Sequence, residues 1–373
     1  MTTGVLLIWA ASAGGAWAGN PCLELRNGYF WDPVKGGYFI PHGVSYQIWN
    51  PPVYANQTTN QVAYDMREMR RMHINSMRVE FTWSQVETSE GVFDFSKTDA
   101  LIDLADQMDM KLFVLMGYQY PPAWFKAAYP ERMGWHYDQY LNQTNMSDVL
   151  NYNCPEARDA YASFLAAICA RYKDRACIGG WIVGNEFAYY DLWEPPDQYP
   201  DHRFLGFDAS YSMPSYRNYL SNRYEGAIFN LNSQWNVSYS GFDQVEMARH
   251  YPTNHQDSLA TQQSGYYDLI QWRKKTIAEF LSAGVGAARG ADTNHLVTYA
   301  MVGGIFSGTD DNNGCEDART IVALCNSNQT PLDFWTVNNY PWAWTGSEMR
   351  SMDFGVAKYR EFVGLPVLIS ECG

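Results

Sequence analysis

Residues 178–187 read IGGWIVGNEF, and residues 365–371 read LPVLISE. In each stretch a short apolar run leads into a glutamate at or near its end, Glu186 in the first and Glu371 in the second. Apolar runs of this length are typical of strands that are buried on both faces of a parallel sheet. Because the carboxyl ends of parallel strands meet on one face of a barrel, we expect Glu186 and Glu371 to share that face.

Further strands and helices alternate around these two stretches. The predicted strands are apolar and rich in β-branched and aromatic residues, and the predicted helices carry apolar residues at helical spacing. Strands are expected at Gly37–Tyr46, Asn75–Phe81, Lys111–Gly117, Ile178–Val183, Leu296–Met301, Asp333–Val337 and Pro366–Ser370. Helices are expected at Gln61–His73, Ala100–Met110, Ala157–Tyr172, Asp268–Ala288, Ala318–Leu324 and Met349–Val363. The alternation indicates an α/β fold in which helices cover a parallel sheet.

Seven strands fit either a doubly wound sheet or a barrel, and the strand ends favour the barrel. Polar residues follow the strands at Arg78, Tyr118, Asn185–Glu186, Asn338–Tyr340 and Glu371. In a barrel these ends converge on the face that carries the active site. We therefore expect a (β/α)8 TIM barrel that is truncated after the seventh strand, because closure needs an eighth. The first and seventh strands should then be separated by roughly twice the ~4.8 Å spacing of paired strands, which would lower both stability and activity.

The chain divides into two expected segments, the second of which contains a long insertion. Residues 1–18 have the pattern of a signal peptide, in which the apolar run Val5–Ala13 precedes an A-x-A cleavage site at residues 16–18. Residues 19–373 form the barrel, with a polar and aromatic insertion at about 193–262, after the fourth strand, that is partly helical at Pro214–Tyr224. We expect a secreted or extracytoplasmic protein whose mature chain is not inserted in a membrane, because no later apolar run reaches about 18 residues.

The composition narrows the class of ligand. The 373 residues carry 40 Asp and Glu against 26 Lys and Arg, a net charge of −14, and they contain no basic run. A polyphosphate would be repelled, so a nucleic acid is not expected as a partner. Aromatic residues make up 16% of the chain, and aromatic faces stack on the C–H faces of sugars. The expected partner is therefore an oligosaccharide or polysaccharide substrate.

Two strand-end glutamates suit the hydrolysis of a glycosidic bond. Retaining glycosidases use one carboxyl group as acid and base and a second as nucleophile, about 5 Å apart. Burial among aromatic residues would raise the pKa of Glu186, as a group that must arrive protonated requires. The sequence has no GxSxG, HExxH, GxGxxG or phosphate-loop motif and no paired cysteines of a zinc ribbon, so neither a cofactor nor a metal is expected.

Long parts of the chain resemble a known enzyme clan. The segment Pro121–Phe187, which opens with PPAWFKAAYP and ends with GGWIVGNEF, is similar to the catalytic barrel of the clan A glycoside hydrolases, most of all the family 42 β-galactosidases. Arg78–Phe95 resembles the second strand and loop of that barrel, and DFWTVNNYP and LPVLISECG resemble its sixth and seventh strand ends. The resemblance runs from about residue 37 to the last residue. The opening hairpin, Leu25–Gly43, also resembles the family 5 endoglycosidases.

The resemblance implies roles for three residues at the strand ends. Glu186 would be the general acid and base, and Glu371 would be the nucleophile of a retaining mechanism. Asn185 would bond the 2-hydroxyl of the sugar, an interaction that strengthens in the transition state.

Two further residues would act on the nucleophile. By the same resemblance Arg78 would bond Glu371 and keep it ionised, and Tyr340 would offer its hydroxyl to the same carboxylate. For Arg78 an ion pair with Glu80 or Glu87 is the structural alternative, and for Tyr340 it is core packing.

Aromatic residues near the strand ends are candidate platforms for sugar rings. These candidates are Trp83, Tyr118, Trp124, Trp342 and Trp344. Trp342 and Trp344 are the strongest, because they lie two residues apart just after a strand-end tyrosine.

The function expected from these observations is a retaining glycoside hydrolase that acts on β-galactosides. The enzyme alternative is a β-mannanase or β-glucanase of the family 5 kind. The alternative from another class is a sugar-binding pseudoenzyme, which would be favoured if either glutamate pointed away from the cleft.

Overall fold

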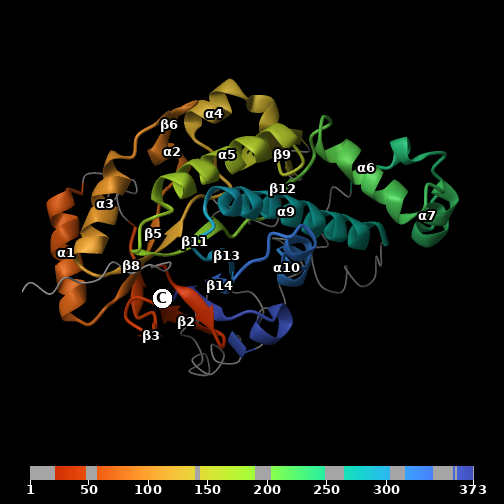
Figure 1. Cartoon of the computed structure of the whole chain (residues 1–373). Helices are drawn as coiled ribbons and strands as arrows, with labels where there is room; N and C mark the ends of the chain where they lie inside the picture. Colours follow the sequence, from red (N-terminus) through yellow and green to blue (C-terminus); the bar gives the residue numbers. More distant parts are fainter. Residues whose placement is uncertain are drawn as a thin grey trace, which may run out of the picture.

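A computed structural model of the chain describes residues 22–47, 57–138, 143–189, 203–247, 264–302, 316–338, 356–357 and 359–372. Its centre is a seven-stranded sheet in the order β15-β14-β13-β11-β8-β5-β4, in which all neighbours are parallel (Figure 1). The strands are β4 (Gly43–Ser45), β5 (Ser76–Glu80), β8 (Lys111–Leu115), β11 (Ile178–Asn185), β13 (Val297–Val302), β14 (Trp335–Asn338) and β15 (Val367–Glu371). The sheet curves into a nearly closed barrel with one open seam, which confirms the predicted barrel class.

Helices cover the outer surface of this barrel (Figure 1). They include α1 (Thr59–Arg71), α3 (Ser96–Gln107), α5 (Pro155–Tyr172), α9 (Ser264–Ala291) and α10 (Ala318–Ser327), each overlapping a predicted helix. Within the last predicted helix, residues 359–363 are helical. Alternation along the strands separates two apolar layers. Met77 and Val79 of β5 pack outward against the helices, whereas Phe113 and Leu115 of β8 pack inside the barrel.

The lower end of the barrel is closed by an antiparallel sheet. It consists of β1 (Glu24–Arg26), β2 (Tyr29–Asp32) and β3 (Gly37–Tyr38). Phe30 packs edge-on against Phe113 and Phe334 inside the barrel, with ring centroids 5.6 and 5.2 Å apart. The sheet therefore fills the bottom of the barrel and leaves the opposite end for polar residues.

The predicted first strand, Gly37–Tyr46, was wrong as a single element. The structure splits it into β3 of the bottom sheet and β4 of the barrel. Pro41, between the two, has no N–H to donate to a ladder, which favours the break. Gly43 lets β4 approach β5 closely, because a Cβ there would lie 2.6 Å from Ser76 Oγ.

The seam of the barrel lies between β4 and β15. The two strands are the edges of the sheet and are not hydrogen-bonded to each other, and no eighth barrel strand occurs in the part of the chain that the structure describes. Some of their Cα atoms come within 8 Å, so the seam is narrower at its closest point than the expected strand-wide gap. A pocket of about 490 Å³ occupies the seam and reaches Arg78 and Glu371.

Smaller elements lie outside the seven-stranded sheet and the helices that cover it. They are α2 (Trp83–Val86), β6 (Glu87–Ser89), β7 (Val92–Phe93), α4 (Ala123–Ala128), η1 (Pro130–Arg132), β9 (Met133–Asp138), β10 (Gln143–Leu150), β12 (Arg203–Leu205), α6 (Ser212–Arg223), α7 (Ile228–Trp235) and η3 (Phe242–Gln244). Of the expected insertion at 193–262, residues 203–247 are described, and α6 corresponds to the helix predicted there. Both α6 and α7 extend to one side of the barrel (Figure 1). The expected signal peptide lies outside the described residues, within which no helix is long and apolar enough to cross a membrane.

A buried polar cluster joins the start of the described chain to the bottom of the barrel. His295 Nδ1 lies 2.6 Å from Asp292 Oδ2, and its Nε2 lies 3.0 Å from both Cys22 Sγ and the carbonyl oxygen of Arg175. The indole of Trp181 donates to the same Asp292 oxygen, at 2.7 Å. Burial alone would lower the pKa of His295, but the hydrogen bonds and charges of Asp292 and Cys22 raise it to about 9.

This cluster predicts a loss of stability at alkaline pH. The folded pKa of His295 lies above its usual 6.5, so its contribution is complete below about pH 6.5 and is lost as the pH rises toward 9. A shift of this size corresponds to a contribution on the order of 3 kcal/mol. Denaturant unfolding of the full chain between pH 6 and 10 should show the decline, and His295→Gln should remove most of it. An equal pH slope in both proteins would contradict the assignment.

Candidate active site

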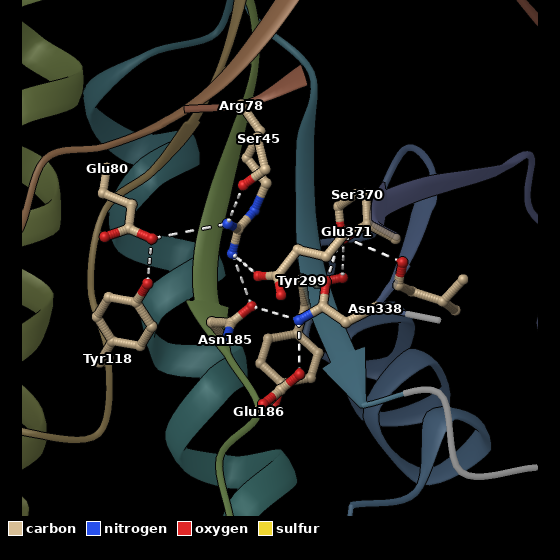
Figure 2. Close-up of polar contacts among 12 residues, drawn as sticks. Ser45, Arg78, Glu80, Tyr118, Asn185, Glu186, Tyr299, Asn338, Ser370 and Glu371 are labelled. Atoms are coloured by element: carbon tan, nitrogen blue, oxygen red, sulfur yellow. Dashed lines mark hydrogen bonds and ion pairs between the residues drawn. The ribbon is translucent and has the colours of Figure 1, made fainter. Parts of the chain in front are cut away.

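The upper end of the barrel carries a connected polar network from four strand ends (Figure 2). Arg78 comes from β5, Asn185 from β11, Asn338 from β14 and Glu371 from β15, and Glu186 follows β11 directly. The two glutamates predicted from the sequence therefore face one site. Their carboxyl groups are joined through hydrogen bonds and an ion pair that run from Glu371 to Arg78, Asn185, Asn338 and Glu186.

The Arg78 guanidinium is the buried cation of the network. Its Nη2 lies 2.6 Å from Glu371 Oε1 and donates to Asn185 Oδ1 at 2.9 Å. Its Nη1 lies 3.7 Å from Glu80 Oε1 and donates to Ser45 Oγ at 3.2 Å. The arginine thus makes both the contact expected with the nucleophile and the structural ion pair considered as its alternative. The side chain of Arg78 is 4% exposed, so its positive charge is concentrated on these neighbours.

Asn338 is a site residue that the sequence did not single out. Its Nδ2 donates to Glu186 Oε1 at 2.7 Å and to Asn185 Oδ1 at 2.9 Å. Its own Oδ1 accepts from Ser370 Oγ at 2.6 Å, which fixes the orientation of the amide. Only its position at a strand end indicated it, and an asparagine at a strand end is equally typical of a turn.

The electrostatic surroundings of Glu186 suit a group that carries a proton. Burial raises the pKa of Glu186, the hydrogen bond from Asn338 lowers it, and the charge of Glu371 raises it again. The net direction is upward, as a general acid requires.

The backbone of Glu186 adopts an uncommon conformation. Its φ is +50°, in the left-handed region that costs a non-glycine residue about 1–3 kcal/mol. Its N–H donates to the carbonyl of Ala300 on β13, at 2.9 Å, and so holds this conformation. Gly184 lets the Phe187 ring pack close to the backbone of β11, because a Cβ at residue 184 would lie 3.1 Å from that ring. The strand therefore ends in a bend that turns Glu186 into the site.

Tyr118 lies next to the network as part of a second buried pair. Its hydroxyl donates to Glu80 Oε1. Burial and the charge of Glu80 raise the pKa of Tyr118, and burial also raises the pKa of Glu80 against the opposing effects of Tyr118 and Arg78. The tyrosine is half-buried, and its hydroxyl is engaged with the protein.

The aromatic residues proposed as sugar platforms differ in how far they are buried. Trp83 is only 2% exposed, stacks on Phe164 with centroids 5.4 Å apart, and donates from its indole to Glu87 at 2.6 Å. It is therefore a core residue rather than a platform, because its faces are covered by protein. Trp124 is half-buried. Tyr340, Trp342 and Trp344 lie outside the described residues.

No residues of the described chain assemble a metal site. Within those ranges, no group of three or more His, Cys, Asp or Glu is arranged to hold a metal ion.

A family model described as beta-galactosidase, that of glycoside hydrolase family 42, matches residues 50–355. The chain belongs to glycoside hydrolase family 42. The match covers the strand ends that carry Arg78, Asn185, Glu186 and Asn338, and it favours family 42 over family 5.

Curated relatives of this family 42 chain share low identity over part of their length. Beta-galactosidase BgaH of Haloferax lucentense is 22% identical over 284 residues, which are 74% of this chain and 37% of that protein. Beta-galactosidase Pbg of Clostridium perfringens is 25% identical over 214 residues, which are 55% of this chain and 28% of that protein. The chain thus matches about a third or less of the length of these relatives.

Solved structures support the fold. A family 42 beta-galactosidase from G. stearothermophilus superposes with a TM-score of 0.67 at 18% identity, covering 88% of this chain and 45% of that one. The catalytic domain of beta-amylase from Paenibacillus polymyxa superposes with a TM-score of 0.69 at 13% identity, covering 87% of this chain and 84% of that one. Two enzymes with different names share the fold, so the fold alone does not define the substrate.

The hydrogen bond from Asn338 to Glu186 predicts a shift in the pH profile. Asn338→Ala removes a contact that lowers the pKa of Glu186, so this pKa should rise and the alkaline limb of kcat/KM should move to higher pH. The rate at the optimum should fall about tenfold, because the carboxyl group loses a positioning contact. Ser370→Ala removes the bond that orients the Asn338 amide but keeps its Nδ2, so it should move the limb in the same direction and by less than Asn338→Ala. A limb that stays in place, or moves to lower pH, would refute this role.

Proposed function

We propose that the chain forms the catalytic barrel of a retaining β-galactosidase. The observation that carries the proposal is the pairing of two different carboxyl environments in one network. Glu371 is ion-paired with Arg78 at 2.6 Å, which suits a nucleophile. Glu186 has a raised pKa and, among the described residues, accepts a hydrogen bond from Asn338, which suits a proton donor.

The proposed reaction proceeds in two displacements. Glu371 attacks C1 of the β-galactoside while Glu186 gives its proton to the departing glycosidic oxygen, and an α-galactosyl ester forms on Glu371. Water then attacks C1, Glu186 takes the proton of that water, and the bond to Glu371 breaks. In the described residues Asn185 Oδ1 accepts two hydrogen bonds, so Nδ2 is the amide atom left to bond the sugar 2-hydroxyl.

The preference for galactosides rests on the family match and on the names of the relatives. The alternatives are a β-mannanase or β-glucanase, and a sugar-binding pseudoenzyme. The position of Glu186 and Glu371 in one network argues against the pseudoenzyme, because both carboxyl groups face the site. We also propose that the protein acts outside the cytoplasm, which the apolar run Val5–Ala13 and the small residues after it support.

Azide rescue distinguishes the two carboxyl roles on an activated aryl β-galactoside. Glu371→Ala should lose nearly all turnover, and azide should restore it with an α-galactosyl azide product, because azide replaces the nucleophile directly. Glu186→Ala should retain attack on good leaving groups, and azide should yield the β-galactosyl azide from the ester intermediate. Glu87→Gln, a buried glutamate that bonds Trp83, is the control and should retain activity. The same azide anomer from both variants would show that the roles are misassigned.

A substrate panel tests the sugar preference separately. The full chain should hydrolyse aryl β-galactosides with kcat/KM at least about tenfold above that for aryl β-glucosides and aryl β-mannosides. Glucose differs from galactose in configuration at C4, and mannose differs at both C2 and C4. Preference for the mannoside or glucoside would support the alternative enzyme. Binding of galactosides without turnover of any aryl glycoside would support the pseudoenzyme.

A further inference from the structure

Three consecutive amides after β11 are held by two parts of the barrel, strand β13 and the segment after β8. The Glu186 N–H donates to the carbonyl of Ala300 at 2.9 Å. The Phe187 N–H donates to the hydroxyl of Tyr299 at 2.8 Å, and the Ala188 N–H donates to Gln119 Oε1 at 2.9 Å. Because Glu186 has a positive φ, its side-chain direction depends on how the peptides on both sides are held.

The Tyr299 hydroxyl takes part in two hydrogen bonds with opposite roles. It donates its single proton to Glu316 Oε1 and accepts from the Phe187 N–H. Tyr299 is fully buried and Glu316 is 4% exposed, so bulk water does not compete for these bonds. Burial and the nearby Glu316 raise the pKa of Tyr299 well above its usual value, which keeps the proton on the tyrosine.

A hydroxyl group has one proton to donate, and Glu316 determines where it points. With the proton directed at Glu316, an oxygen lone pair is left to face the Phe187 N–H. Without the carboxylate the hydroxyl could rotate, and its proton would compete with the Phe187 N–H for the same space. The orientation set by Glu316 is therefore transmitted to the peptide that follows Glu186.

We propose that Glu316 and Tyr299 act together as positioning residues for the acid and base Glu186. The proposal rests on the proposed function, because it assigns Glu186 the proton transfer. Neither residue touches the reacting atoms in this scheme. They hold the peptide between Glu186 and Phe187, and so they hold the carboxyl group in reach of the glycosidic oxygen; Figure 2 shows Tyr299 with Glu186 and Asn338.

A second buried tyrosine in the same aromatic cluster provides a matched control. Tyr161 packs against Phe187 and Phe280 with centroids 5.8 and 5.4 Å apart, and its hydroxyl donates to the carbonyl of Val183 at 2.6 Å. It is as buried as Tyr299, and it bonds the interior of β11 rather than the peptide after Glu186. Tyr161→Phe removes one hydrogen bond to a backbone carbonyl, whereas Tyr299→Phe removes the bonds to the Phe187 N–H and to Glu316 and should destabilise the fold more, so the two variants are compared at a temperature at which both are folded.

The test compares Tyr299→Phe with Tyr161→Phe on two aryl β-galactosides. For phenyl β-galactoside, a poor leaving group that needs protonation, kcat/KM should fall about 10- to 100-fold in Tyr299→Phe. For 2,4-dinitrophenyl β-galactoside, which needs little protonation, kcat/KM should fall less than about threefold. Tyr161→Phe should change both rates by a similar small factor. Equal losses on both substrates in Tyr299→Phe, or the same pattern in Tyr161→Phe, would overturn the proposal.

Glu316 supplies a second, independent variant pair. Glu316→Gln keeps an oxygen that can accept the Tyr299 proton and should stay near wild type on both substrates. Glu316→Leu removes the acceptor and should reproduce the leaving-group pattern of Tyr299→Phe. Combined in one chain, Tyr299→Phe and Glu316→Leu should cost little more than either alone, because they interrupt the same chain of contacts. Full additivity would contradict a shared role.

A readout without turnover separates failure of this proposal from failure of the proposed function. Hydrogen exchange of the Phe187 amide should be at least about tenfold faster in Tyr299→Phe than in Tyr161→Phe. If wild type hydrolyses no aryl β-galactoside, the proposed function fails, and the exchange rate still tests the contact. If wild type is active and the Phe187 amide exchanges equally slowly in both variants, the positioning role of Tyr299 is wrong.

Discussion

The buried guanidinium of Arg78 is the interaction on which the upper end of the barrel depends. It lies on the inward face of β5 and contacts three other residues of the network, Glu371, Glu80 and Asn185. The negative charge of Glu371 raises the pKa of Glu80, because like charges in a protein site repel. Arg78 contacts both carboxyl groups and offsets that repulsion. The carboxyl groups of Glu371 and Glu186 can differ in charge because they differ in partners: a cation for Glu371 and a neutral amide for Glu186.

The second constraint is the bend of the chain at Glu186. If β11 continued straight, its side chains would keep alternating between the two faces of the sheet. The positive φ of Glu186 instead turns the chain at the end of the strand. The bend persists because neighbouring strands and loops bond the amides that follow it, and because Phe187 packs between Tyr152, Tyr161 and Phe280. Rigid support of this kind suits the proton transfer proposed for Glu186, since small displacements of a catalytic group lower the rate steeply. The packing of α5 and α9 on the barrel and the bend that carries Glu186 thus depend on the same aromatic cluster.

Much of this arrangement could be predicted from the sequence, and the missing parts have physical reasons. The strand ends at Glu186 and Glu371 were predictable because buried parallel strands have a clear apolar pattern and converge at one face. Asn338 and Glu316 were not predictable as site residues, since polar residues beside a strand or helix end follow the same pattern in turns and caps. Trp83 was misjudged because nothing in its local sequence shows which way an aromatic ring will pack. The antiparallel pairing of β9 with β12 joins segments far apart in the chain, and a short strand of that kind depends on tertiary contacts.

In the proposed mechanism Glu371 forms the covalent intermediate, and Glu80 and Glu186 do not. The most direct test is to incubate the full chain with a 2-deoxy-2-fluoro-β-galactoside that carries a good leaving group, and to map the labelled peptide by mass spectrometry. The fluorine slows both displacements and the activated leaving group preserves the first, so the ester accumulates. One fluorogalactosyl group per chain is expected, on Glu371. A label on Glu186 or Glu80 would contradict that mechanism.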